Sequence, residues 1–161
     1  MGIQPEHIRL HLERVLGEES VLLAELEQVL AAEAAVVRGD DPGAIENIGA
    51  NRHRCVARLT QLDGERASAC RMLSFGSGRE AFERLLAWCD PAQSLRPRWQ
   101  SNLACAHRCK ELNDRNGAVV MARMGQVQQR LATLRGEVPG PVYARRGGRF
   151  EGVAPRILGQ A

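Results

Sequence analysis

The sequence predicts an all-α protein on two observations. Its composition is poor in aromatic residues (4%) and rich in Ala, Leu, Glu and Arg, and long stretches repeat apolar residues at helical rather than alternating spacing. At 161 residues the chain is long enough for one domain with a real core. We expect an antiparallel bundle of about three long helices and one short helix over residues 1–135, followed by a flexible C-terminal tail over residues 136–161.

The first long helix is predicted from an apolar repeat that extends from Ile8 to Val37, and we expect it to span about 34 residues. Two rows of apolar residues repeat every seven positions here and form one stripe, which predicts a helix roughly 50 Å long. Gly39 and the following "DDPG" supply a stop and a new start, with Asp41 as the N-cap and Pro42 in the first turn. The rows are Val15, Leu22, Val29, Val36 and Leu16, Leu23, Leu30, Val37.

A second helix is predicted from an apolar run that extends from Ile45 to Leu73, and "SFGSG" at 74–78 ends it. Gly49 and Gly64 lie inside it and weaken its intrinsic helicity, so this helix must depend on its neighbours. A short amphipathic helix follows in "REAFERLLAWCD" at 79–90 and is bounded by the prolines of "DPAQSLRPRW".

The last long helix contains Asn116-Gly117, a dipeptide that usually marks a turn. A turn would reset the phase of the apolar stripe, yet the phase continues from Trp99 through this point to Leu134. We therefore predict one helix from about Ala92 to Arg135.

Asn113, Asn116 and Gly117 share one face of that helix. Amides on a buried seam can fix the register of packed helices, and a glycine lets two backbones approach closely. Alternatively, the asparagines are half-buried and bond to their own helix. We favour the seam for Asn113 and leave both interpretations open for Asn116.

Residues 136–161 carry six glycines and three prolines and show no sustained periodicity. Such a segment cannot bury enough surface to order itself. Its spaced apolar residues favour a recognition segment, although a simple linker stays an alternative.

The net charge of +3 hides an asymmetry, because residues 1–50 sum to −7 and residues 51–161 to +10. We interpret the two charges as solvated helix faces of opposite sign, and intrachain pairing is favoured over a nucleic-acid footprint. The arginines are dispersed among acids, and only "ARRGGR" at 144–149 forms a cluster. Nucleic acid is therefore not an expected partner.

The sequence favours neither catalysis nor a cofactor. His7 and His11, like Cys105 and Cys109, are spaced to share a helix face, but two ligands do not complete a structural zinc site. No nucleophile motif or phosphate loop stands out. The five cysteines are odd in number and widely spaced, which favours reduced thiols packed as small apolar residues. No apolar run approaches the ~20 residues that cross a bilayer.

The order of these elements resembles the FlgN family of flagellar type III export chaperones. The resemblance spans nearly the whole chain: a long helix, the "GDDPGAI" break, an arginine-rich second helix, a short helix and a loose tail. Its most specific parts are "ELNDRNGAVV" with Asn113-x-x-Asn116-Gly117, and the L-x-x-L-x-G of Leu131, Leu134 and Gly136.

The resemblance implies a cytoplasmic chaperone that binds the C-terminal helical segments of hook–filament junction (hook-associated) proteins. It implies that the chaperone prevents their aggregation and delivers them to the export apparatus. By the same resemblance, the client-binding residues lie on the last helix at Val120, Met124, Val127, Leu131 and Leu134. Intrachain core is the alternative for these five residues.

The resemblance also implies that Tyr143 docks at the membrane export gate, the chaperone's one association with the membrane. The export ATPase complex is a further candidate partner, and the exposed stripe leaves a homodimer open. A generic helical adaptor or a nucleic-acid-associated bundle is the alternative function.

Overall fold

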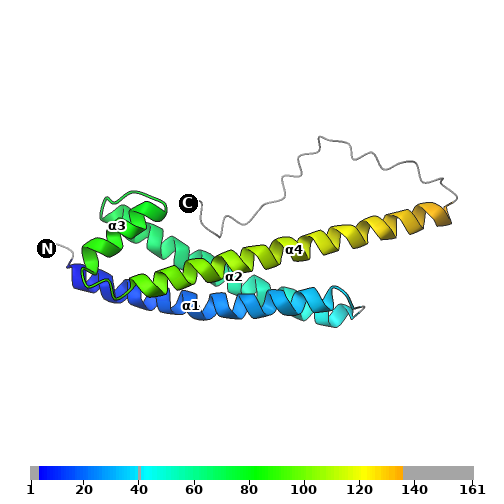
Figure 1. Cartoon of the computed structure of the whole chain (residues 1–161), viewed down its shortest axis with the longest axis horizontal. Helices are drawn as coiled ribbons and strands as arrows, with labels where there is room; N and C mark the ends of the chain where they lie inside the picture. Colours follow the sequence, from blue (N-terminus) through cyan, green and yellow to red (C-terminus); the bar gives the residue numbers. More distant parts are fainter. Residues whose placement is uncertain (1–3, 40, 136–161) are drawn as a thin grey trace.

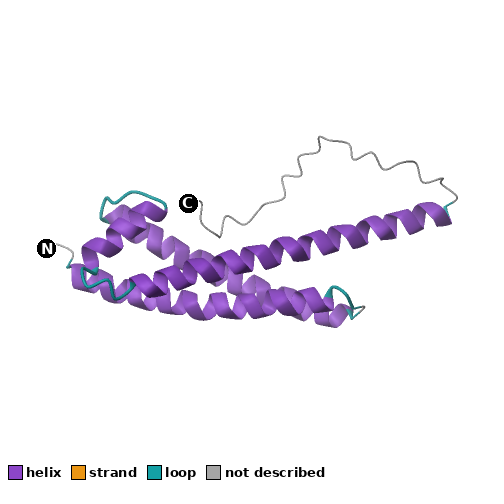
Figure 2. Ribbon diagram, viewed as in Figure 1, coloured by secondary structure: helices purple, strands orange, loops and turns teal. Residues whose placement is uncertain are grey.

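The computed structural model describes residues 4–39 and 41–135, and this part of the chain folds into four α-helices without a strand. They are α1 (Pro5–Val36), α2 (Pro42–Met72), α3 (Arg79–Cys89) and α4 (Arg96–Leu134). Figures 1 and 2 show three long helices side by side, with α3 packed at the end where α1 begins. The predicted all-α class is confirmed. The predicted tail, Tyr143 included, lies outside the described residues.

The predicted break between the first two helices is confirmed. The Asp41 side chain accepts hydrogen bonds from the backbone N–H of Gly43 at 3.0 Å and of Ala44 at 3.3 Å, and Pro42 stands in the first turn of α2. A carboxylate at this position satisfies amides that have no partner inside the helix. The α2–α3 connection needs positive φ at Ser74, Gly76 and Gly78, which explains the glycines of "SFGSG".

The last helix begins at Arg96 rather than near Ala92 as predicted. The reason is the buried Asp90, whose carboxylate accepts from the backbone N–H of Leu95 at 2.7 Å and from the Ser94 hydroxyl at 2.8 Å. These bonds stabilise a loop over residues that sequence alone assigns to the helix. From Arg96 the helix runs without interruption through Asn116-Gly117, as predicted from the unbroken apolar phase.

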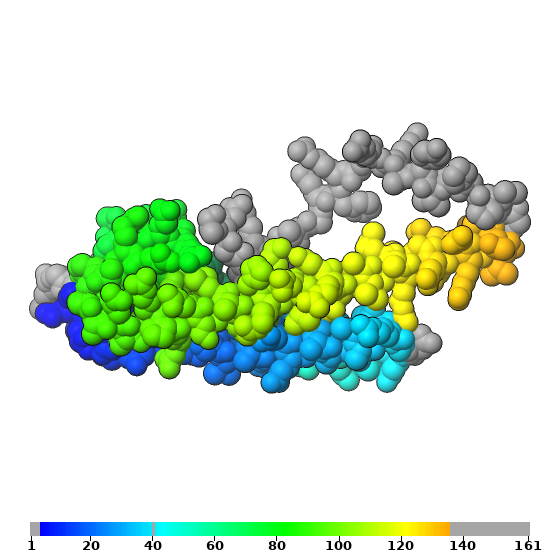
Figure 3. Space-filling view, viewed as in Figure 1, coloured from blue at the N-terminus to red at the C-terminus, as the bar shows by residue number. Residues whose placement is uncertain are grey.

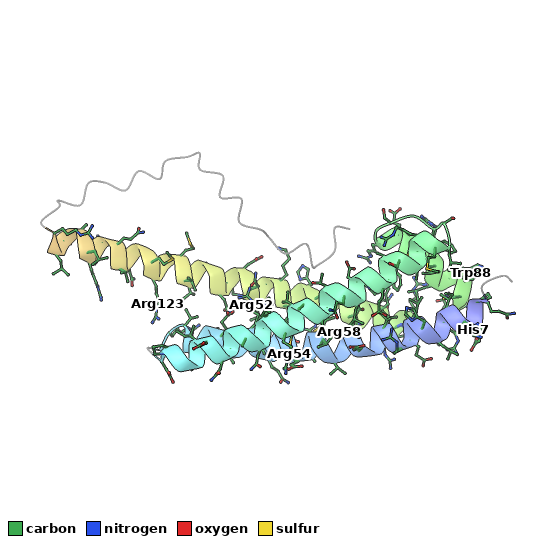
Figure 4. The ribbon with its side chains drawn as sticks, turned by 180° about the vertical axis from the view of Figure 1, so that it is seen from behind. His7, Arg52, Arg54, Arg58, Trp88 and Arg123 are labelled. Carbon is green, nitrogen blue, oxygen red and sulfur yellow. The ribbon has the colours of Figure 1, made fainter. Side chains whose placement is uncertain are left out.

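The helices α1 and α2 are antiparallel. Ion pairs join the two helices in reverse order: Arg52, Arg54 and Arg58 of α2 pair with Glu33, Glu25 and Glu18 of α1 respectively. Glu65 of α2 pairs with Arg14 of α1, so the α1 residue number falls steadily as the α2 residue number rises. Figure 4 shows Arg52, Arg54 and Arg58 following one another along α2. This pair has the antiparallel arrangement that the sequence predicted.

The helices α1 and α4 run parallel, so α2, which runs opposite to α1, also runs opposite to α4. Three donors of α4 bond to backbone carbonyls of α1, each across a separation of 86 residues: Asn102 to Leu16 at 3.0 Å, Cys109 to Leu23 at 3.6 Å, and Asn116 to Leu30 at 2.8 Å. A constant separation means that both helices advance in the same direction. Helix α2 returns the chain to the end where α1 starts, and α3 with its two loops lies at that end, so α4 runs in the same direction as α1 (Figure 1).

Two apolar clusters form the core. One lies beside α3, where the Phe82 and Trp99 rings meet edge to face with centroids 4.7 Å apart. The other joins the middles of the three long helices and consists of Leu23, Leu26, Leu30, Cys55, Leu59, Cys105 and Cys109. In α4 the last buried residue is Asn116, so the core covers only the first part of that helix.

Candidate partner-binding surface

The two parts of α4 differ in how much of the bundle they contact, and we name them by their residues. The proximal segment, residues 96–116, contains every buried residue of the helix. The distal segment is residues 117–134. The space-filling view shows the distal segment, coloured yellow to orange, extending past the end of the α1–α2 pair (Figure 3).

The proximal segment is held on α1 by polar side chains spaced seven residues apart. Asn102 donates to the Leu16 carbonyl and also lies 3.3 Å from the Glu19 carboxylate. Asn116 repeats this arrangement two heptads later, donating to the Leu30 carbonyl and, at 2.8 Å, to Glu33. Buried amides satisfied in this way fix how two helices are aligned along their length.

Arg123 continues the same seven-residue row at the end of α1. Its guanidinium donates to the carbonyl of Arg38 at 2.8 Å and to that of Gly39 at 3.4 Å. The carbonyls that follow the last turn of a helix have no partner inside it, and a cation is favourable there. Figure 4 shows Arg123 extending from α4 toward this end of α1. Within the described residues, Arg123 therefore makes the last hydrogen bonds from α4 to the rest of the bundle.

Beyond Arg123, α4 has no α1 beside it. The constant offset of 86 residues places Val36, the last residue of α1, opposite residue 122. Residues 123–134 continue for about 18 Å at 1.5 Å per residue. This is enough length for three turns of a second helix to pack against.

The five predicted client-binding residues all lie on the distal segment, and their side chains are exposed. Val120 is 41% exposed and Leu134 83%, whereas Cys109 in the proximal segment is 1% exposed. The five positions are spaced four, three, four and three residues apart, which makes one apolar stripe along the helix. We call this surface the distal stripe: Val120, Met124, Val127, Leu131 and Leu134.

The alternative interpretation was that the residues of the distal stripe belong to the intrachain core. Their exposure in the structure does not agree with it. Val119 and Met121 add to the exposed apolar surface, at 36% and 69% exposure. Monomeric soluble proteins seldom leave a contiguous apolar surface uncovered unless it binds something.

The three residues expected on the seam are placed differently from one another. Asn116 is buried on the α1–α4 interface, whereas Asn113 is half-buried and accepts a hydrogen bond from Arg52 of α2. Gly117 is exposed, and a Cβ built on it would meet no atom within 4 Å. The expectation that Gly117 lets two backbones close together is therefore wrong, because its position faces open space.

All five thiols are reduced and buried, as the sequence suggested. Burial raises the pKa of Cys89 to about 11 and that of Cys109 to about 12. Cys105 lies close to Glu27, and burial together with this carboxylate raises the pKa of its thiol as well. Thiols in this state are protonated at neutral pH and are poor nucleophiles and metal ligands.

The histidine pair and the cysteine pair do not form parts of a metal site in the described region. His7 and His11 lie in the first turns of α1, whereas Cys105 and Cys109 contact Glu27 and Leu23 further along that helix. Within residues 4–39 and 41–135, no three His, Cys, Asp or Glu side chains are grouped so that they could hold an ion.

The sequence matches the family model for FlgN protein over residues 11–149, which is most of the chain. The chain belongs to the FlgN family. Neither a curated protein nor a solved structure matches it significantly. The FlgN family consists of flagellar export chaperones and is not an enzyme family. The match begins inside α1 and extends past α4, so it includes the whole distal segment.

Two further features of the described residues concern the surfaces of the helices. None of the four helices is both long and apolar enough to cross a membrane. The most exposed apolar surface is on a helix rather than in a pocket, which suits a protein that binds a polypeptide.

Sequence reasoning missed the polar residues that align α4 on this FlgN chain. It did not single out Asn102 or Arg123. It also missed the salt bridge between Glu19 and Arg66, in which Arg66 Nε lies 2.9 Å from Glu19 Oε1. A signal was available for two of them, because Asn102, Cys109, Asn116 and Arg123 repeat every seven residues on the inner side of the helix. The buried Glu19 had no such signal, and burial raises the pKa of its carboxyl although Arg66 opposes the shift.

Proposed function

We propose that this protein is a cytoplasmic chaperone for the hook–filament junction (hook-associated) proteins of the flagellum. It binds their C-terminal helical segments, prevents their aggregation before assembly, and delivers them to the type III export apparatus. The observation that carries this proposal is the distal stripe, an exposed apolar helix face that continues past the end of its intrachain partner. Family membership supports the general role in flagellar export.

The distal stripe suits an amphipathic client helix. Such a helix buries its own apolar face by packing along the stripe, and residues spaced three and four apart on both helices interdigitate. Covering this face on the client removes the surface through which unassembled subunits aggregate. Met124 at the centre is flexible enough to fit side chains of different shape, which would let one surface accept more than one client.

The direct test mixes the purified full-length chain with the C-terminal segment of a junction protein from the same genome, followed by size-exclusion chromatography. We expect a defined complex at tens of micromolar. The Leu131→Asp variant should lose the complex and keep its helicity by circular dichroism, because a charge on the stripe cannot be buried against a client.

Gln129→Asp is the matched control, since residue 129 is exposed on the opposite side of the same turn. It should bind as the unchanged chain does. A chain that forms no complex would refute the chaperone function. Equal binding by Leu131→Asp and the unchanged chain would refute the assignment of the site alone.

Delivery is proposed to use Tyr143, which lies outside the described residues. An amphipathic aromatic ring is a suitable anchor at a protein interface. Tyr143→Ala should leave client binding unchanged and weaken co-migration with the cytoplasmic domain of the export gate. Binding to the export ATPase complex is tested in the same way. If Tyr143→Ala changes neither interaction, Tyr143 has no part in the mechanism.

A further inference from the structure

The charged residues of the distal segment, Arg123 and Arg130, are both basic. Between Asp114 and Glu137 the chain has no acidic residue, while Arg115, Arg123, Arg130 and Arg135 are all present. Arg123 is occupied with the carbonyls that end α1. Arg130 lies on the row that Arg123 continues, one heptad further, where α1 no longer runs alongside.

The proximal segment shows what kind of helix packs on α4. Its partner α1 holds seven glutamates and two arginines. Three of these glutamates meet donors of α4: Glu19 meets Asn102, Glu27 pairs with Arg108 at 2.7 Å, and Glu33 meets Asn116. An acidic amphipathic helix therefore satisfies both the apolar face and the flanking donors of α4.

We propose that the distal segment binds an acidic amphipathic helix, α1-like in its charge, with a carboxylate facing Arg130. This rests on the proposed function and specifies the client: its binding segment has apolar residues at heptad spacing, flanked by Asp or Glu. The client helix takes the place that α1 would occupy if it were about three turns longer. Charge complementarity along a helix pair selects the partner and its alignment more than it adds affinity.

The same charges argue against the other occupants of the distal stripe. A second copy of this chain would bring Arg130 and Arg135 against the arginines of its partner, and like charges beside a seam disfavour pairing. The chain's own residues 136–161 hold four arginines and two glutamates, so they are also basic. Nucleic acid is disfavoured because the arginines flank an apolar stripe rather than forming a polar surface.

The test uses two labelled three-heptad peptides that are identical except at the positions flanking their leucine seam, which are all Glu in one and all Lys in the other. Binding to the full-length chain is measured by fluorescence anisotropy at about 50 mM and about 150 mM salt. We expect the Glu peptide to bind at least about 10-fold more tightly at the lower salt, with a smaller ratio at the higher salt.

Arg130→Glu should lower that ratio at least about 3-fold. Lys110→Glu is the matched control, because it changes the charge equally on the same helix, on the exposed side of the proximal segment. The control should leave the ratio within about 2-fold.

Several results would overturn the inference. The first group concerns the peptides: equal binding of the two, or no binding of either at about 100 µM. Equal effects of Arg130→Glu and Lys110→Glu would also overturn it. So would evidence for another occupant, either displacement of the Glu peptide by duplex RNA at about 150 mM salt or a dimer, seen by sedimentation velocity, that Leu131→Asp dissociates.

The junction-protein segment separates this inference from the proposed function. If that segment binds the unchanged chain and Arg130→Glu equally well, the inference is wrong and the chaperone function stands. If it does not bind at all while the Glu peptide is still preferred, the chaperone function is wrong and the preference for an acidic helix stands.

Discussion

The proximal and distal segments of α4 continue one pattern and have opposite environments. Both repeat apolar residues every three and four positions, and no break separates them. The proximal segment has α1 beside it, and its Trp99, Cys105 and Cys109 are buried. The distal segment extends past Val36, and its Met124, Val127 and Leu131 are about half exposed. The length of α1, rather than the pattern of α4, sets the point where burial ends.

This comparison shows that heptad periodicity identifies a helix interface but does not identify its partner. An apolar stripe is worth roughly the same free energy whether the covering helix belongs to the same chain or to another. What distinguishes the segments is the polar residues beside the stripe. Buried asparagines in the proximal segment bond to α1, whereas the distal segment replaces them with arginines.

The largest difference between the segments is expected in stability. Trp99→Ala should lower the free energy of unfolding by about 3–5 kcal/mol, since it leaves a cavity beside Phe82. Leu131→Ala should change it by less than about 0.5 kcal/mol, because its side chain is already half exposed. Urea denaturation followed by far-UV circular dichroism measures both. Similar losses in the two variants would mean that the distal stripe is covered within the chain.

A second, smaller effect is expected from the buried amides. Asn116→Ala removes the donor to Leu30 and Glu33 from a buried site and should cost about 1–3 kcal/mol. Asn113→Ala should cost less than about 1 kcal/mol, because Arg52 keeps its pairing with Glu33 when this half-buried acceptor is lost. The same denaturation experiment compares them, and a larger cost at Asn113 would reverse our ranking of the two asparagines.

Most of the helices were predictable because their signals are local. Asp41 and Pro42 mark a helix start, "SFGSG" marks an end, and the unbroken phase through Asn116-Gly117 marks a continuous helix. The start of α4 was missed because Asp90 forms its bonds to Ser94 and Leu95 only once the loop has folded. Such a bond depends on geometry that residue preferences do not contain.

The alternating direction of the long helices follows from their order along the chain. The alignment of α4 along α1 was not predictable in the same way, because a heptad stripe fits a neighbouring helix in several registers. The exposed state of the distal stripe was equally hidden, because it follows from where α1 ends once the two helices are aligned. The role of Gly117 was predicted wrongly for a related reason: sharing a face with Asn116 does not place a residue at the contact.

Alkaline pH should destabilise the fold through the buried thiols of the proximal segment. In the folded chain the pKa of Cys109 is raised to about 12, above the ordinary value of 9.0, so from pH 9 upward the unfolded chain loses a proton that the folded chain keeps. The contribution of this thiol is fully present below pH 9 and falls as pH rises toward 12. One such group lowers stability by up to about 1.4 kcal/mol per pH unit.

The measurement is urea denaturation at intervals between pH 8 and pH 11 for the unchanged chain and for Cys109→Ala. The variant should show a shallower loss of stability over this range, even if its stability at neutral pH is lower. Parallel curves would mean that Cys109 ionises as readily in the folded chain as in the unfolded one.

The smallest expected effect is a gain in stability within the distal segment. Gly117→Ala and Gly125→Ala should each stabilise the chain by up to about 1 kcal/mol, because alanine restricts the unfolded chain and its Cβ meets open space at both positions. Amide hydrogen exchange resolves this, with slower exchange expected beyond residue 117. Destabilisation by Gly117→Ala would instead reveal a close helix contact there. If the affinity for the client rises together with helicity, the client binds the distal segment as an ordered helix. If the affinity falls, binding requires this segment to rearrange, and its two glycines serve that rearrangement.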